Sequence, residues 1–247
     1  MAFKDGDFIE VEYSVWNAAG NTMLETTNEK LAKEHGIYSK DVRYGPVLII
    51  LGAHSVVKGL DSALREIEQG KEKKITLKPA EAFGERNPDL VRVMPLSEFR
   101  KRDVDPYPGM RVDLDNVGAT VKSVNSGRVV LDANHPYAGM DVTYEVRVVK
   151  RLTGGEEKVS ALGRTYGSEP GRVKIDGKRI EVEYGDSVKK NADYFIGKAN
   201  LIAAVFSNLK DAEEVRVVEE YKRPKEAQED GHEHEHAGEQ AASAIKA

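Results

Sequence analysis

The stretch that decides the fold runs from Pro46 to Gly70 and has the sequence PVLIILGAHSVVKGLDSALREIEQG. It opens with Val47 to Leu51, a continuous run of apolar residues that favour strands. Gly52 interrupts this run. A short apolar run that is bounded by turn residues predicts a strand buried on both faces.

A helix is predicted to follow this strand. It is expected from about Leu60, because apolar residues then recur at intervals of three and four along the chain. Gly70 is the expected C-cap, since glycine adopts the left-handed conformation that ends helices at little steric cost. The residues at the helix start, Val56 to Leu60, are mostly apolar, whereas helix starts are usually polar. The sequence therefore predicts that the start of the helix forms the floor of a pocket.

Composition limits the classes of function. The chain has 247 residues, enough for a sizeable core and for two or three domains. Charged residues make up 32% of the chain, its net charge is -5, and acids and bases are interspersed, so nucleic acid is not an expected partner. The chain has no cysteine, which excludes disulfides, thiol catalysis and cysteine-ligated zinc.

Targeting signals and common catalytic motifs are also absent from the sequence. The N-terminal residues contain no apolar segment of the signal-peptide kind, and no window approaches the roughly 20 apolar residues that span a bilayer. We therefore expect a cytoplasmic protein with no membrane partner. No GxSxG, HExxH, P-loop or GxGxxG motif occurs, so hydrolase and nucleotide-binding functions have no support.

Segments on both sides of the opening stretch predict the rest of a sheet. Alternating or β-rich runs predict strands, and residues 28–35 predict a short helix with Asn28 as its N-cap. The predicted strands are Phe8–Trp16, Met23–Thr26, Lys74–Leu77 and Asp141–Val149.

Two motifs within these segments carry a resemblance. The pattern GxxxVVxGLxxAL begins at Gly52, and after a further strand it is followed by Ala82-Phe83-Gly84. From about residue 6 to residue 151 the chain resembles the FKBP-type peptidyl-prolyl cis-trans isomerases, in particular the SlyD-like and long archaeal-type branch. The resemblance implies an α+β fold in which a curved antiparallel sheet wraps around one helix. It also implies an enzyme that requires no cofactor.

The resemblance further implies a division into domains. A long insertion follows Phe83-Gly84, and it resembles the small, mainly β insert-in-flap chaperone domain of SlyD-like members. A chain can leave and re-enter a fold in this way if the two ends of the insertion lie close together. The expected domains are residues 1–84 with 137–152 as the isomerase, 85–136 as the insert, 156–222 as a C-terminal α+β domain and 223–247 as a disordered tail.

Local patterns predict the C-terminal domain. Asp176-Gly177 lies between two alternating runs, which is a strong signal for a β-hairpin. A long helix is expected over Ala192–Leu209, and one stripe of it has more apolar surface than one small hairpin covers. We therefore expect a homodimer that forms through this domain. The predicted stripe consists of Phe195, Ala199, Ile202, Val205, Phe206 and Leu209.

Isomerisation of an X-Pro bond makes simple chemical demands. The uncatalysed barrier is about 20 kcal/mol. The twisted transition state is less polar than the planar amide, so an apolar pocket with little water favours it. The resemblance also implies that the backbone N–H of Val57 meets the substrate carbonyl. The pocket residues that it implies are Tyr13, Leu24, Glu25, Val47, Val56, Val57, Leu60, Phe83 and Tyr144.

Three of these residues depart from the drug-binding members of the family. Leu60 replaces an aromatic floor, Glu25 occupies the place of the usual Asp, and Phe83 lacks the hydroxyl of a Tyr. We therefore do not expect tight macrolide binding. Isomerisation is still expected, because the apolar character of the pocket persists.

Apolar residues also gather around Pro95 in the insert. The resemblance implies that they form a groove for extended segments of unfolded or proline-containing polypeptides, which are the expected partners. Such a groove would raise the effective concentration of prolines near the pocket. The candidate client-binding residues are Leu90, Val91, Val93, Met94, Leu96 and Phe99.

Simpler interpretations stay open for both sets of residues. The aliphatic pocket residues are also compatible with a plain core, Tyr13 with a hydrogen-bonded core tyrosine, and Glu25 with a solvated carboxylate. The apolar residues of the insert are compatible with its own small core. A protein that kept the fold and lost catalysis would be a non-catalytic holdase chaperone.

The tail contains His232, His234 and His236, which alternate with glutamates. Imidazoles at this spacing can bind Ni, Zn or Cu, and SlyD-like members often carry metal-binding tails. We expect at most weak metal binding there, and a solvated acidic tail is the alternative. A metallochaperone function would rest on this tail alone.

Overall fold

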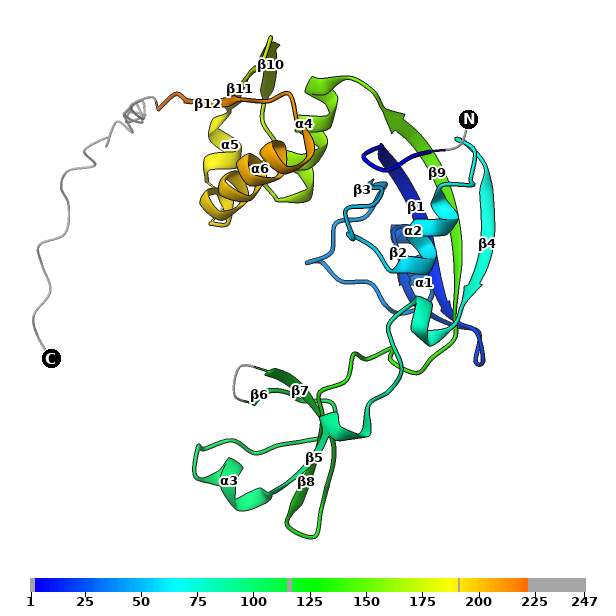
Figure 1. Ribbon diagram of the computed structural model, residues 1–247. Coiled ribbons are helices and arrows are strands. Elements are labelled where there is room, and N and C mark those ends of the chain that lie inside the picture. The colour runs from blue at the N-terminus through cyan, green and yellow to red at the C-terminus, as the bar shows by residue number, and fades with distance from the viewer. Residues whose placement is uncertain (1–2, 115–116, 191, 222–247) are drawn as a thin grey trace, which may run out of the picture.

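The computed structural model describes residues 3–114, 117–190 and 192–221. Within these residues the backbone forms three sheets, and the second is inserted into the chain of the first. In Figure 1 the first sheet lies at the right, the second lies below it and the third lies at the upper left.

The first sheet is antiparallel and is built around its last strand. That strand, β9 (Val142–Leu152), pairs with β1 (Phe8–Asn17) on one side and with β4 (Glu72–Leu77) on the other. β2 (Thr22–Thr26) and β3 (Val47–Ile50) both pair with β1. The strands predicted for this sheet are therefore present, and the final strand lies inside the sheet.

Two short helices belong to this sheet. α1 (Glu29–Glu34) begins after Asn28, whose side chain accepts hydrogen bonds from two N–H groups of the first turn, so the predicted N-cap is confirmed. α2 (Lys58–Leu64) lies against the curved sheet (Figure 1) and buries Leu60 and Leu64. The result is the expected α+β fold, an antiparallel sheet curved around one helix.

The helix α2 is shorter than predicted. It ends at Leu64, and Arg65 is its C-cap. The carbonyl of Arg65 accepts a hydrogen bond of 3.2 Å from the N–H of Phe3. In a longer helix this carbonyl would accept from an N–H one turn further along the chain, so the bond to Phe3 replaces a helical hydrogen bond. Gly70 has a φ of +81°, but it lies in a later turn and donates to the carbonyl of Val148. The prediction of Gly70 as the C-cap is therefore wrong.

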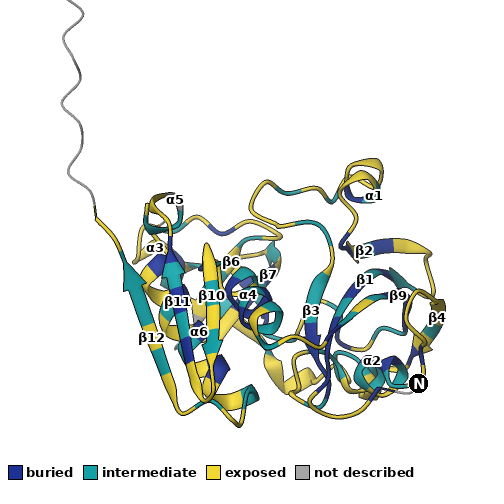
Figure 2. Cartoon of the chain, turned by 90° about the horizontal axis from the view of Figure 1, so that it is seen from above, coloured by how far each residue is buried: buried dark blue, intermediate teal, exposed yellow. Residues whose placement is uncertain are grey.

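The second half of β3 is buried on both faces, as the sequence predicted. Ile49 belongs to the core between the sheet and α2. Ile50 points to the opposite side and belongs to a second core, together with Phe8 and Leu152 of the same sheet. Figure 2 colours this end of β3 dark blue. The second core is shared with the C-terminal part of the chain, so the first and third sheets belong to units that pack against each other.

The inserted part forms its own sheet and core. Its strands have the order β5-β8-β7-β6, and all of its neighbours are antiparallel. The bounds are β5 (Val91–Pro95), α3 (Leu96–Arg100), β6 (Arg111–Leu114), β7 (Val117–Asn125) and β8 (Arg128–Asp132), preceded by the short 3-10 helices η1 (Pro79–Glu81) and η2 (Pro88–Leu90). The buried residues of its core are Phe99, Ala119, Val121, Val129 and Leu131.

The C-terminal part contains a three-stranded sheet and helices. β10 (Arg172–Asp176) and β11 (Arg179–Tyr184) form the predicted hairpin, and β12 (Glu214–Glu219) joins β11 in parallel. The helices are α4 (Gly155–Thr165), α5 (Asp186–Lys189) and α6 (Tyr194–Asn208). The predicted long helix is therefore present as α6, with its ends shortened.

The helix α4 was not predicted from the sequence. Gly155 begins this helix, and a Cβ there would lie 2.6 Å from the side chain of Ile175. The glycine therefore serves close packing against β10 rather than a flexible connection. Val159 and Leu162 of α4 are fully buried in the second core.

The apolar stripe predicted for α6 is out of phase with the structure. The residues that α6 buries are Tyr194, Gly197, Leu201, Ala204 and Val205. Of the predicted stripe only Val205 is fully buried, whereas Phe195 and Phe206 are 64% and 46% exposed. The backbone of Tyr166 lies directly against Gly197, which sets the inward face of the helix.

Candidate functional site

A cavity of about 350 Å³ opens where the start of α2 meets β1 and β9. Its volume is within the range of small-ligand sites, which is roughly 300 to 1,000 Å³. The residues that line it are Tyr13, Glu25, His54, Ser55, Val56, Val57, Leu60, Phe83 and Tyr144.

The start of α2 forms the floor of the cavity. Leu60, in the first turn, is 1% exposed, and Val57 is the N-cap residue. A valine cannot cap the helix with its side chain, and no side-chain hydrogen bond caps α2. The N–H of Val57 donates no hydrogen bond to any of the described residues. The floor is therefore apolar, with one backbone donor beside it.

Close packing holds this helix start in place. A Cβ at Gly59 would lie 2.5 Å from the side chain of Leu77, at the end of β4. Only glycine allows the first turn of α2 to approach the sheet so closely. The N–H of Gly52 donates to Oδ1 of Asp61 at 3.1 Å, which fixes the loop before the helix.

Two tyrosines form one wall. The rings of Tyr13 on β1 and Tyr144 on β9 lie 6.0 Å apart at an angle of 56°. The hydroxyl of Tyr13 donates a hydrogen bond of 2.5 Å to Oε1 of Glu25. Burial raises the pKa of both tyrosines, that of Tyr144 to about 12, and the carboxylate of Glu25 raises them further. Both hydroxyls are therefore neutral at physiological pH.

The opposite wall contains Phe83, which belongs to an aromatic cluster that the sequence did not predict in full. The ring of His135 stacks on Phe83 at 4.6 Å between centroids, and the two planes are 5° apart. Tyr137 lies edge-on to both rings, at 5.2 Å and 5.4 Å. These two rings belong to residues 134–139, the hinge through which the chain returns from the insert to the first sheet, and no local pattern indicated that they reach Phe83.

The cavity gathers all of the pocket residues expected from the sequence except Leu24 and Val47. Leu24 packs against the core from the edge of the sheet, and its carbonyl accepts a hydrogen bond from the hydroxyl of Tyr137. Val47 is half-buried at the start of β3, opposite Val11. His54 and Ser55 line the cavity although neither was selected from the sequence, since two polar residues in a loop have no distinctive pattern.

The two chain segments between this site and the insert are tied together. The N–H of Gly139 donates to the carbonyl of Gly84 at 2.8 Å, and the N–H of Asn87 donates to the Asn134 side chain at 2.8 Å. Arg86 forms an ion pair with Asp132, whose side chain is 3% exposed. Burial alone would raise the pKa of Asp132, but hydrogen bonds from Asn134 and Arg86 lower it. The hinge therefore holds an ionised carboxylate with several partners.

The six candidate client-binding residues of the insert lie in different environments. Phe99 is buried in the core of the insert, and Met94 and Leu96 pack against that core. Leu90 and Val93 are 41% and 59% exposed, while Val91 is half-buried. A cavity of about 260 Å³, lined by Met94, Phe99, Val104, Met110 and Val112 among others, opens beside α3. The simpler interpretation as core therefore fits Phe99 best, although Phe99 also lines this cavity.

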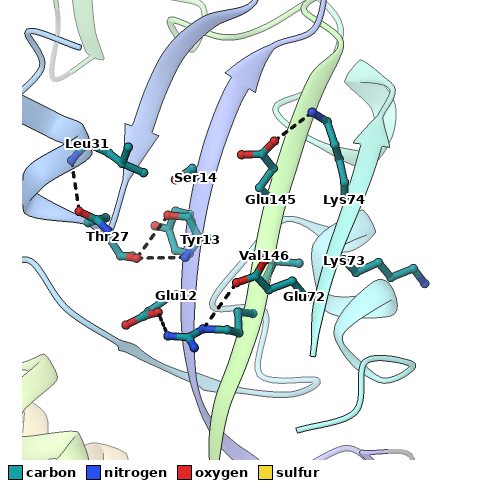
Figure 3. A pocket seen from close by; sticks show the side chains of 12 residues that line it. Glu12, Tyr13, Ser14, Thr27, Leu31, Glu72, Lys73, Lys74, Glu145 and Val146 are labelled. Carbon is teal, nitrogen blue, oxygen red and sulfur yellow. Dashed lines mark hydrogen bonds and ion pairs between the residues drawn. The ribbon is translucent and has the colours of Figure 1, made fainter. Parts of the chain in front are cut away.

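A larger depression of about 470 Å³ lies on the outer face of the first sheet (Figure 3). Charged side chains line it, and each of them forms an ion pair. Arg147 contacts Glu12 at 2.5 Å, and Lys74 contacts Glu145 at 2.9 Å. Pairs of this kind satisfy their own charges, so the depression is less suited to an apolar substrate than the smaller cavity on the α2 side.

Two further observations concern metal binding and membrane-spanning helices. Among the described residues no group of three or more His, Asp or Glu side chains is arranged to hold a metal ion. The histidines proposed for metal binding, His232, His234 and His236, lie outside the described residues. No helix in the described part of the chain is long and apolar enough to cross a membrane.

An apolar cavity between a curved antiparallel sheet and a single helix, with neutral hydroxyls at its wall, suits an uncharged, largely apolar segment of a ligand. Residues 1–97 match the family described as FKBP-type peptidyl-prolyl cis-trans isomerase, and residues 92–137 match the description FKBP26, IF domain.

Individual relatives support the same assignment. The chain is 30% identical over 145 residues to the short-type peptidyl-prolyl cis-trans isomerase of Methanocaldococcus jannaschii, which covers 59% of this chain and 91% of that protein. It is 32% identical over 130 residues to SlyD of Treponema pallidum, covering 51% and 73%. It is 25% identical over 163 residues to SlyD of Helicobacter pylori, covering 64% and 80%. The chain belongs to the FKBP-type peptidyl-prolyl cis-trans isomerases and is an enzyme of that class.

Proposed function

We propose that the protein accelerates X-Pro isomerisation in unfolded or partly folded chains at the cavity above α2, and holds those chains with its inserted domain. The observation that carries this proposal is the apolar cavity itself, with Leu60 as its floor and aromatic rings as its walls. An apolar site with little water disfavours the polar, planar amide relative to the less polar twisted transition state.

Each part of the cavity has a role in this mechanism. The proline ring lies on Leu60, between the tyrosine wall and Phe83. The N–H of Val57 donates no hydrogen bond within the described part of the chain. It therefore donates to the substrate carbonyl and fixes its orientation. Tyr13 and Tyr144 supply apolar surface and neutral hydroxyls, since their pKa values are raised by burial. No proton transfer to the substrate is required.

We propose that the chain is divided into four parts. Residues 1–84 with 137–152 carry catalysis, and 85–136 form the client-holding insert. Residues 156–222 form the C-terminal domain, and 223–247 form a tail. The separate core of the insert and the hydrogen bond between Gly84 and Gly139 support this division, because they allow the insert to leave the isomerase at one point.

Excision of the insert tests the proposal. Because Asn87 and Asn134 are already hydrogen-bonded to each other, residues 88–133 can be replaced by a short glycine-containing turn that leaves His135 and Tyr137 in place. The shortened protein is expected to isomerise a short proline peptide at a rate similar to the full chain, but to lose most of its effect on proline-limited refolding of a protein. Equal refolding activity in both proteins would contradict the role of the insert.

The C-terminal domain is proposed to form a homodimer. Phe195 and Ile196 are 64% and 66% exposed at the start of α6, and Tyr221 is 67% exposed after β12. Large exposed apolar side chains that gather in one region mark association surfaces. The double variant Phe195→Glu, Ile196→Lys is expected to halve the mass measured by light scattering, and a monomeric wild type would contradict this proposal.

The histidines of the tail are proposed to bind Ni, Zn or Cu weakly, without a role in catalysis. Imidazole nitrogens suit these metals. A chain truncated at Pro224 is expected to lose metal binding in a titration with Ni and to keep its isomerase activity. Equal binding by the truncated and full chains would contradict this assignment.

A further inference from the structure

A second depression lies next to the catalytic cavity, between β3 and the C-terminal helices. It has a volume of about 450 Å³ and is formed by β3, the loop after it, α4 and α6. We call it the interdomain groove, and define it by Leu48, Ser55, Leu162, Asn200 and Ala203.

The groove adjoins the catalytic cavity across one loop. Ser55 lines both, Ala53 lines the groove and His54 lines the cavity, so three consecutive residues separate the two spaces. His54 adopts a φ of +56°, which a residue with a side chain rarely does. The loop is held by hydrogen bonds from Gly52 to Asp61 and from Ala53 to the carbonyl of Ile50. A chain that leaves the cavity past His54 therefore meets the groove directly.

The walls of the groove are fixed relative to the cavity. Ile50 of β3 and Leu162 of α4 belong to one buried core that joins the two parts of the chain. Arg164, near the end of α4, forms an ion pair of 3.0 Å with Glu10 of β1. Because packing and charge both lock this junction, the groove is a preformed surface rather than a gap between mobile domains.

The chemistry of the lining indicates the class of ligand. None of the twelve residues that line the groove is charged, in a chain in which 32% of residues are charged. Ile50, Leu162 and Ala204 form a buried apolar floor, and Asn200 and Ser207 lie exposed at the rim. A neutral lining has no charged side chain to bind an anion or a metal ion. Its amides and hydroxyls can instead form hydrogen bonds with the N–H and C=O groups of an extended peptide.

We infer that the interdomain groove binds the uncharged, extended segment of the substrate polypeptide that flanks the proline on one side. This inference rests on the proposed function, because it takes the cavity above α2 as the place of the proline. It assigns to α4 and α6 a direct role in substrate selection. Substrates long enough to reach the groove are therefore bound better than short ones.

A peptide series tests the inference with the full-length protein. A tetrapeptide with one X-Pro bond is compared with two longer peptides, in which about four uncharged residues, roughly 13 Å of extended chain, are added before or after it. One of the two extensions is expected to raise kcat/KM about tenfold, since contacts outside the reacting bond raise kcat/KM. No gain with either extension would overturn the inference.

Variants of α6 locate the effect. Ala203→Glu places a charge in the neutral groove and is expected to abolish the gain from the longer peptide while leaving the tetrapeptide rate unchanged. Asn200→Arg, also in the groove, is expected to act in the same way. Ala199→Glu is the matched control, because Ala199 is an exposed alanine of the same helix outside the lining. Equal gains in Ala203→Glu and Ala199→Glu would overturn the inference.

Two other outcomes are distinguishable. If the wild type does not isomerise the tetrapeptide, the proposed catalytic cavity is wrong, whatever the groove binds. If Ala203→Glu changes the mass measured by light scattering and Ala199→Glu does not, a second copy of the chain occupies the groove, which also overturns the inference.

Discussion

The hydroxyl of Tyr13 on β1 donates a hydrogen bond of 2.5 Å to Oε1 of Glu25 at the edge strand β2. The two strands pair directly, with Val15 opposite Glu25. Burial and the neighbouring carboxylate both raise the pKa of Tyr13, so the hydroxyl stays a donor over the physiological range. The bond fixes the ring as a wall of the catalytic cavity, and leaves its apolar face toward the substrate.

The proposed mechanism needs the ring of Tyr13 more than its hydroxyl. Tyr13→Phe is therefore expected to lower kcat/KM for a short peptide by no more than about threefold, since the apolar wall that the substrate contacts stays in place. Tyr13→Ala is expected to lower it more than tenfold, because it removes apolar wall. Equal losses in the two variants would show that the hydroxyl, and not the ring, is the essential group.

The stack of His135 on Phe83 is predicted to support the opposite wall. His135→Ala is expected to lower kcat/KM by about two- to tenfold, the range that corresponds to an aromatic pair worth about 0.5–1.5 kcal/mol. His35→Ala serves as the control, since His35 packs edge-on against Trp16 at 5.2 Å and not against Phe83. A similar loss in both variants would contradict a specific role for His135.

The exposed apolar residues of the insert are predicted to contact unfolded clients. The double variant Leu90→Glu, Val93→Glu is expected to lose most of the ability to suppress aggregation of a refolding protein, while its rate on a short peptide stays the same. Val42→Glu is the matched control, because Val42 is 50% exposed but lies in the isomerase part of the chain. Unchanged suppression in the double variant would place client binding elsewhere.

The C-terminal domain is predicted to lose stability in acid through Glu219. Hydrogen bonds from Lys198, Tyr221 and Tyr194 lower the pKa of Glu219 from its ordinary value of 4.5 to about 2. The unfolded chain takes up the proton first as the pH falls, so this contribution is complete above pH 4.5 and is lost between pH 4.5 and about 2.

Circular dichroism of wild type and Glu219→Gln measures this contribution. The variant is expected to have the lower Tm at pH 6, and the difference in Tm is expected to shrink as the pH falls below 4.5. A difference that stays constant down to pH 2.5 would contradict the assignment to this carboxylate.

Local patterns were sufficient for most of the first sheet and for the floor of the cavity, whereas the residues of its walls were expected from the resemblance. Strands such as Phe8–Asn17 alternate with a period of two, and the motif from Gly52 to Leu64 places the helix and its apolar start in one short segment. Both signals depend on neighbours in the sequence. For this reason, Val56, Val57 and Leu60 were identified correctly as residues that come together.

The errors arose where distant residues decide the structure. The start of α4 at Gly155 was missed, because it depends on Ile175, which packs where a Cβ of this residue would be. The phase of α6 follows from the contact of Gly197 with the backbone of Tyr166, which a count of apolar residues ignores. His54 reaches the cavity only through the fold of its loop. None of these contacts has a signature in the local sequence.

The most direct test of the account is the isomerisation rate of a short peptide of the Ala-Leu-Pro-Phe type with the full-length protein. Wild type is compared with Tyr13→Ala and Leu60→Lys in the cavity, and with Glu12→Ala on the opposite face of β1 as the control. We predict clear acceleration by wild type and by Glu12→Ala, and its collapse in both cavity variants, with circular dichroism of Tyr13→Ala unchanged. No acceleration by wild type, or full activity in Tyr13→Ala, would contradict the account.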